Sequence, residues 1–354
     1  MKKFVLIFAI CVAFISCSSV VVPNYKVDYS DEGRENRRIY EEQVAELKKS
    51  RQQVKLTENY DDSGNVINGG EIQEEEEKMP EKSLLEVSRE KVVRIVHISD
   101  FHSSSYGINN DTLIKKIQDA KPDLIVLTGD IFDFKTSFAR PVQNVRYLID
   151  GIKDIAPFYY VSGDTEFYSY HECEFNHLIT DNGGIILEGK AVELSVPLGK
   201  IILAGLPDPY IDMTIDERSH NLENREKYLE RIENLKVETE NLQKKSGKVL
   251  FTALLAHRPE YIDEYKAAGC FDLVLSGHTN GGIWKFGDFM KGLYAKNQGF
   301  FPKYAGGLYE FFDEPKPSAL VISRGLSYQK LSLPRVGTNP ELVVIDVVPH
   351  ESRF

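Results

Sequence analysis

Residues 91–130 read KVVRIVHISDFHSSSYGINNDTLIKKIQDAKPDLIVLTGD. The stretch begins and ends with short apolar runs rich in β-branched residues, 91–98 and 123–128, and polar groups follow each run. Runs of this kind are typical of buried central strands. Between them, residues 111–122 have the apolar spacing of a helix. A strand, a helix and a second strand in this order predict a parallel sheet in an α/β fold.

The same alternation continues along the chain. A helix is expected over 142–154 and a strand over 157–164. Further short apolar runs predict strands at 184–189, 191–196, 200–208, 249–257, 272–278, 319–325 and 342–348. The whole pattern therefore predicts one α/β domain over residues 91–350.

A long charged stretch, residues 214–248, interrupts this rhythm. Its apolar positions on one helical face are Tyr228, Ile232, Leu235 and Leu242. We expect a surface helix or two, packed on the domain through that face. A lid and a partner-binding coiled coil are the alternatives, although four apolar positions do not sustain a heptad pattern.

The N-terminus has the layout of a bacterial export signal. Two lysines precede an apolar run from Phe4 to Ile15, which is too short to span a bilayer comfortably. FISC, residues 14–17, resembles a lipoprotein processing site at which Cys17 is lipidated. Cleavage further on and an uncleaved anchor are the alternatives. We expect residues 1–17 to be a signal peptide and the protein to be exported and anchored to the membrane.

Residues 18–90 are polar and charged, and they include the acidic run EIQEEEEKMPEK. This composition predicts a flexible tether between the anchor and the domain. Beyond the signal and Cys17, the cysteines are Cys173 and Cys270. They either pair in an oxidising compartment or remain two unpaired thiols.

The net charge of −11 argues against a broad electrostatic contact with phosphate backbones, so nucleic-acid binding is not expected. The charge does not exclude a metal site for a small anionic substrate, because a metal ion acts locally.

Polar side chains follow the ends of several predicted strands. They are Asp100 and His102, Asp130 and Asp133, His257, and His278. In open α/β sheets the carboxyl ends of the strands face one ligand crevice, so these side chains are expected to converge. Carboxylates and imidazoles together are ligands for Mn, Fe, Zn or Mg, and a carboxylate is able to bridge two ions.

Five short motifs occur in order: DFH at 100–102, GDIFD at 129–133, GDTE at 163–166, AHRP at 256–259 and GHTN at 277–280. The set resembles the motifs of the calcineurin-like metallophosphoesterases. KYAGGLYE, ISRGL, LPR and NPEL, between 303 and 342, are similar to the tail of the exported or membrane-associated branch with YkuE-like and YaeI-like members. The resemblance implies a two-sheet β-sandwich flanked by helices, with four layers in the order αββα.

The resemblance also implies the ligands of one or two divalent ions, Mn, Mg or Fe, with Zn as a further candidate. The first ion would be held by Asp100, His102, Asp130 and Asn280. The second would be held by Asp130, Asp164, His257 and His278. Asp133 would orient its loop.

Three positions depart from the family pattern: Asp164 replaces an asparagine, Thr165 a histidine and Asn280 a histidine. Asp164 remains a good ligand for hard cations. With Asn280, the first site is expected either to prefer Mg or Mn over Zn or to bind its ion weakly. Thr165 stands where the family places an acid, and a hydroxyl is a weak acid near neutral pH. His171 and His177 are candidates to supply the missing acid; the alternative is that both are ordinary surface or helix residues.

The function implied is a phosphoesterase that uses metal-activated hydroxide, with Asp130, Asp164 and Thr165 at the reacting centre. Without the histidine, substrates with good leaving groups are expected, such as pyrophosphates or aryl phosphates. The anchor favours a phosphorylated substrate at a membrane, such as a phospholipid head group or a lipid-linked pyrophosphate. A catalytically impaired binding module of the same fold and an interaction protein are the alternatives.

Overall fold

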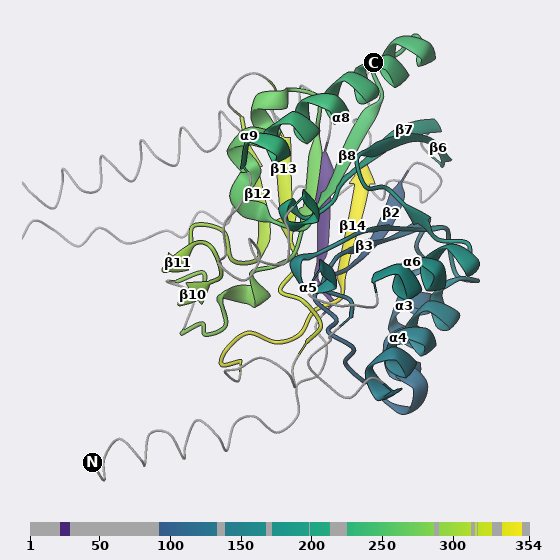
Figure 1. Ribbon diagram of the computed structural model, residues 1–354, viewed down its shortest axis with the longest axis vertical. Coiled ribbons are helices and arrows are strands. Elements are labelled where there is room, and N and C mark those ends of the chain that lie inside the picture. The colour runs from purple at the N-terminus through teal and green to yellow at the C-terminus, as the bar shows by residue number, and fades with distance from the viewer. Residues whose placement is uncertain are drawn as a thin grey trace, which may run out of the picture.

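The computed structural model describes residues 22–28, 92–132, 139–167, 172–197, 199–212, 225–286, 290–312, 316, 318–327 and 335–348. Two six-stranded sheets form the centre of the molecule (Figure 1). The first sheet has the order β1 (Asn24–Asp28), β14 (Val343–Val348), β2 (Val93–Ile98), β3 (Leu124–Thr128), β4 (Phe158–Val161) and β5 (Ile185–Ile186). The second has the order β12 (Gly307–Phe311), β13 (Ser318–Ile322), β9 (Leu273–Ser276), β8 (Phe251–Ala256), β7 (Gly199–Leu206) and β6 (Lys190–Val196).

The central strands run parallel, as the alternation of strands and helices predicts. In the first sheet β2, β3, β4 and β5 pair in parallel, and β14 lies antiparallel to β2. In the second sheet β7, β8, β9 and β13 pair in parallel, with antiparallel strands β6 and β12 at the two edges. The carboxyl ends of β2, β3 and β4 therefore lie at one edge of the first sheet.

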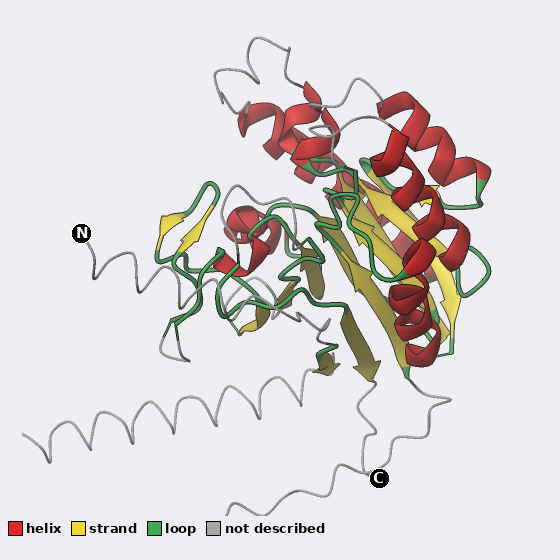
Figure 2. Ribbon diagram, turned by 90° about the horizontal axis from the view of Figure 1, so that it is seen from below, coloured by secondary structure: helices red, strands yellow, loops and turns green. Residues whose placement is uncertain are grey.

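Helices cover the outer face of each sheet (Figure 2). The first sheet packs against α3 (Asp111–Ala120), α4 (Ala139–Ile152) and α6 (Glu172–Asp181). The second packs against α8 (Arg225–Ser246) and α9 (Ile262–Ala268). The predicted α/β fold class, a two-sheet sandwich with αββα layers, is confirmed.

Strand alternation explains the layers. In β2, Val93 and Ile95 face the space between the sheets, while Val96 and Ile98 face the helices. All four side chains are fully buried, so removing apolar surface from water stabilises both interfaces. Helix α8 follows the same logic, because its buried face contains Tyr228, Ile232 and Leu235. The charged stretch is thus a surface helix over its described part, as its sequence predicts.

The structure departs from the predicted tether at its beginning. Residues 24–28 form β1, which pairs in parallel with β14 at the edge of the first sheet. The short sequence NYKVD is too polar to indicate a strand by itself, and the open edge of β14 supplies the pairing. The signal peptide, Cys17 and tether residues 29–90 lie outside the described residues. No helix in the described part of the chain is long and apolar enough to cross a bilayer.

The two cysteines of the domain differ in what the structure describes. Cys270 is a free cysteine, and burial raises the pKa of its thiol to about 12. The side chain of Cys173 lies outside the described part. A free Cys270 favours the alternative of unpaired thiols.

A buried histidine between the sheets predicts sensitivity to acid. Burial and the nearby His257 lower the pKa of His97 to about 3, and its Nε2 lies 2.7 Å from the hydroxyl of Thr128. Because the unfolded chain binds this proton from about pH 6.5 downward, the folded state loses about 1.4 kcal/mol per pH unit between about pH 6.5 and 3. Between pH 7 and 5 we expect the free energy of unfolding to fall by about 2 kcal/mol more in the unmodified protein than in His97→Gln. Urea unfolding of both proteins with a chelator present measures this, and parallel pH profiles would contradict it.

Candidate metal centre

The loops that leave the central strands have an unusual backbone. Asp100, His102, Asp130, His278 and Asn280 all have positive φ, between 43° and 67°. Residues other than glycine adopt this region at an energetic cost, and such strain concentrates at functional sites. Five of the seven residues that the sequence singles out as ligands are therefore held in conformations that ordinary loops avoid.

Glycines allow these loops to approach one another closely. A Cβ on Gly129, which has φ of 81°, would overlap the backbone nitrogen of Gly163. A Cβ on Gly277 would overlap the hydroxyl oxygen of Ser99 and Oδ2 of Asp100. The motif glycines are thus required by packing of one loop against the next.

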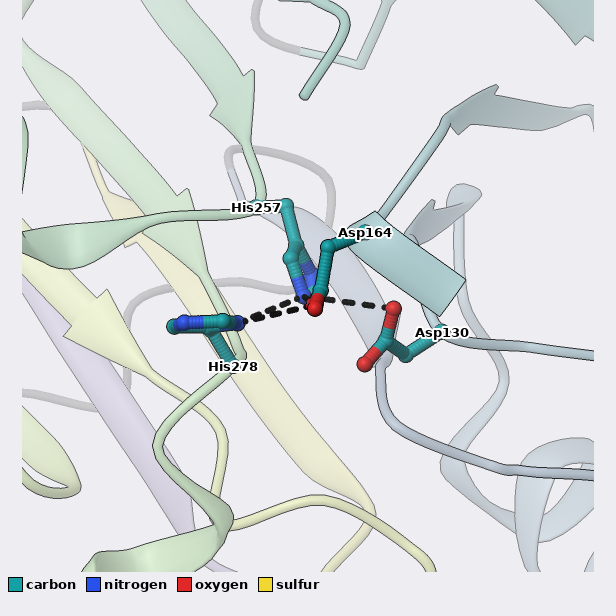
Figure 3. Close-up of side chains that lie close together, drawn as sticks. All are labelled: Asp130, Asp164, His257 and His278. Carbon is teal, nitrogen blue, oxygen red and sulfur yellow. Dashed lines mark hydrogen bonds and ion pairs between the residues drawn. The ribbon is translucent and has the colours of Figure 1, made fainter. Parts of the chain in front are cut away.

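One group of candidate ligands comprises Asp130, Asp164, His257 and His278, all of them buried (Figure 3). Nε2 of His257 lies 3.4 Å from a carboxylate oxygen of each aspartate. Nδ1 of His278 lies 3.1 Å from Oδ1 of Asp164 and 3.2 Å from Nε2 of His257. The side chains point toward one another from three loops and the start of α5 (Asp164–Phe167), and each offers an atom within 4.8 Å of the others.

A second group comprises Asp100, His102 and Asp130. Nε2 of His102 lies 3.5 Å from Oδ2 of Asp130, whereas the first group uses Oδ1 of the same carboxylate. Asp130 therefore belongs to both groups and presents one oxygen to each. This arrangement is compatible with a carboxylate that ligates a cation on each side.

The histidines are oriented as metal ligands are. Nδ1 of His257 lies 2.6 Å from the carbonyl oxygen of Thr128, and because a carbonyl only accepts, Nδ1 carries the proton. With a proton fixed on Nδ1, Nε2 is the nitrogen that faces Asp130 and Asp164 and the one that would ligate a cation held by these carboxylates.

The buried group of Asp130, Asp164, His257 and His278 attracts positive charge. Burial and the Asp164 carboxylate act to raise the pKa of Asp130, yet the neighbouring imidazoles of His257 and His102 outweigh them and lower it to about 2. Burial acts to lower the pKa of His257, but the Asp130 and Asp164 carboxylates raise it well above its usual value. Buried carboxylates that attract protons onto neighbouring imidazoles attract a cation in the same way, so the donor set fits a divalent metal ion.

Lys296, which the sequence did not indicate as a site residue, lies beside this group of ligands. Its ammonium contacts Oδ2 of Asp164. Its Nζ also lies 5.9 Å from the centroid of the Tyr210 ring. Burial acts to raise the pKa of Asp164, but His278, His257 and Lys296 hold it well below its usual range. A cation of the chain itself thus neutralises the Asp164 carboxylate.

Thr165 and Asn280 have partners of their own. The amide and hydroxyl of Thr165 each lie 2.9 Å from Oδ1 of Asp130, so Thr165 orients the shared carboxylate. The side-chain amide of Asn280 donates to Asp100 over 3.3 Å and its oxygen accepts from Arg335 over 3.0 Å. These hydrogen bonds place Asn280 beside Asp100, and its role as a metal ligand stays a prediction.

Glu166 holds the ligand loops together and was also missed. Its carboxylate accepts hydrogen bonds from the backbone amides of Asp130, Ile131, Phe132 and Gly163, over 2.7–3.1 Å. Burial and the Asp130 charge raise the pKa of Glu166 to about 8, against the effect of the amide donors. Its position as the last residue of GDTE was the available signal.

Of the remaining predicted residues, Asp133 and His171 lie outside the described part of the chain. His177 lies exposed on α6 and belongs to neither ligand group, and its role as a replacement acid stays a prediction.

The sequence that contains both ligand groups is similar to that of known proteins. A family model described as calcineurin-like phosphoesterase matches residues 93–281, more than half of the chain. The uncharacterized protein YpbG of Bacillus subtilis is 26% identical over 254 residues, covering 71% of this chain and 79% of YpbG. The uncharacterized metallophosphoesterase YkuE of the same organism is 28% identical over 268 residues, covering 71% and 77%.

Among solved structures, TT1561 of Thermus thermophilus is 14% identical with a TM-score of 0.37, covering 67% of this chain and 91% of that one. Sequence carries the assignment: the family model spans the strands and loops that bring both ligand groups together. The chain belongs to the calcineurin-like phosphoesterase family.

Proposed function

We propose that the protein is a metal-dependent phosphoesterase that holds two divalent ions. The observation that carries this proposal is the shared Asp130, which presents one carboxylate oxygen to each ligand group. Metal ions bound there would supply Lewis acidity and lower the pKa of water. The chain's own contribution is to fix the ligands: Glu166 holds the loops, Thr165 orients Asp130, and Thr128 sets the tautomer of His257.

The substrate class follows from what the site lacks. Thr165 is bound to Asp130 and to the carbonyl of Phe132, so its hydroxyl is a poor proton donor to a leaving group. A positioned general acid contributes roughly 10²–10⁴-fold. We therefore favour phosphodiesters or pyrophosphates with good leaving groups. We further propose export and lipidation at Cys17, which would place the substrate at a membrane.

A catalytically impaired binding module is the second candidate, and two contacts favour it. Lys296 neutralises Asp164, and Arg335 engages the amide of Asn280, so cations of the chain adjoin both ligand groups. The Lys296 contact weakens the need for a metal ion at Asp164, and the Arg335 contact uses the oxygen that Asn280 would offer to a metal ion.

Metal content and hydrolysis of one preparation distinguish the two candidates. The preparation should begin at residue 22, because β1 belongs to the first sheet. After loading with Mn, Mg or Zn, we expect two ions per chain and turnover of a bis-aryl phosphate or a nucleotide-sugar pyrophosphate. One ion or none, with no turnover even after Thr165→His and Asn280→His are combined, would favour the binding module.

A further inference from the structure

A basic and aromatic segment lies beside the metal centre. Residues 290–304 read MKGLYAKNQGFFPKY, with three lysines and no acidic residue, in a chain whose net charge is −11. The segment forms the two-stranded hairpin β10 (Tyr294–Ala295) and β11 (Gly299–Phe300). Figures 1 and 2 show this hairpin apart from the two large sheets.

Large apolar side chains of the hairpin face solvent. Phe300 is 70% exposed, Phe301 is 71% exposed and Tyr294 is 39% exposed. The rings of Tyr294 and Phe300 pack edge to face with centroids 5.4 Å apart. Soluble proteins rarely expose adjacent aromatic side chains in this way unless the surface contacts a partner or a membrane.

Lys291 and Lys303 lie on either side of the hairpin in sequence, and each contacts another aromatic ring. Nζ of Lys291 lies 4.1 Å from the ring centroid of Tyr309, and Nζ of Lys303 lies 4.9 Å from that of Tyr304. Burial and the charge of Lys303 lower the pKa of Lys291, as expected for two neighbouring ammonium groups. Aromatic rings with lysines beside them suit the bilayer interface, where rings enter the headgroup region and lysines attract anionic lipids.

The hairpin is joined directly to the metal centre. The backbone amide of Leu293 donates to the carbonyls of Gly282 and Trp284, in the segment that follows His278. Lys296, at the turn between β10 and β11, contacts Asp164 of the ligand cluster. A surface that holds the hairpin would therefore lie beside the ligands.

We propose that the hairpin surface, formed by Lys291, Tyr294, Phe300, Phe301 and Lys303, docks on the interface of an anionic lipid bilayer. The argument is charge complementarity: this local excess of positive charge on an acidic protein matches an anionic membrane, and the exposed rings match its acyl boundary. Docking would present phosphate linkages of lipid headgroups to the metal centre. That last step rests on the proposed phosphoesterase function, whereas the docking does not.

Vesicle co-sedimentation of the chain from residue 22, which keeps every described residue, tests the docking. We expect binding to vesicles of phosphatidylglycerol with phosphatidylcholine, and much weaker binding to phosphatidylcholine alone. Phe300→Ser with Phe301→Ser should weaken binding at least about tenfold, and Lys291→Gln with Lys303→Gln about fivefold per lysine. The matched control is Val249→Ser, because Val249 is 90% exposed outside the hairpin and should not affect binding.

Hydrolysis of a water-soluble aryl phosphodiester, measured on the same variants, separates the two proposals. If the hairpin variants keep the turnover of the unmodified protein but lose vesicle binding, docking through the hairpin surface is supported. If the unmodified protein turns over the diester but does not bind vesicles, or if all variants bind vesicles equally, the docking alone is overturned. Self-association that Phe300→Ser with Phe301→Ser abolishes, without any vesicle binding, would also overturn it and identify a second copy as the occupant. Vesicle binding without turnover would leave the docking standing and refute the phosphoesterase proposal.

Discussion

Asp130→Asn will lower kcat/KM for an aryl phosphodiester by about 10³-fold or more and will reduce bound metal from two ions to one or none. Asp130 is the one residue common to both ligand groups, with Oδ2 near His102 and Oδ1 near His257. The amide has one oxygen in place of two and no charge, so it does not serve both positions. Losing one preorganised electrostatic group commonly costs 10²–10³-fold, and two ions would depend on Asp130 in the function we propose.

The control for this variant is Asp119→Asn, which removes an exposed carboxylate paired with Lys115 on α3. Its turnover and metal content should equal those of the unmodified protein. Metal analysis and initial rates, with urea unfolding to verify the fold of Asp130→Asn, make the comparison. Two ions per chain and near-normal turnover in Asp130→Asn would show that the shared carboxylate is not the bridge.

The fold was predictable wherever local pattern and tertiary environment agree. Strands such as β3, with five consecutive buried residues, bury both faces and therefore read as continuous apolar runs. β1 lacks this signal because only its pairing with β14 defines it. A polar edge strand is determined by the neighbour it meets, and one sequence does not reveal that neighbour.

The candidate ligands were predictable for a related reason. Asp100, Asp130, His257 and His278 lie within two residues of the end of a strand, so the sheet fixes their places, and Asp130, His257 and His278 lie together in one group. Lys296 and Arg335 were not predictable, since each reaches the centre from a segment distant in sequence. A long side chain gives no local pattern that tells where its charged end lies.

Arg258 shows the same limit in the AHRP motif, where sequence singled out His257 alone. Its guanidinium is fully buried and binds Asp208 through two nitrogens, over 2.6 and 3.0 Å. The Tyr210 ring lies against it, with the guanidinium carbon 4.4 Å from the centroid. Burial acts to lower the pKa of Arg258, but the Asp208 carboxylate raises it well above its usual value. The ion pair with Asp208 therefore fixes Arg258, the residue next to the candidate ligand His257.

Asp208→Ala will lower the free energy of unfolding by about 3–5 kcal/mol, because it leaves a buried guanidinium without its main counter-charge. Urea unfolding measures the change. Asp150→Ala is the matched control, since Asp150 forms an exposed pair with Lys153 whose loss should cost less than about 1 kcal/mol. Asp208→Leu with Arg258→Met should recover most of the loss, as apolar replacements of buried pairs do. Equal losses in Asp208→Ala and the double variant would mean that the loop at Tyr210, whose amide also binds Asp208, carries the effect instead.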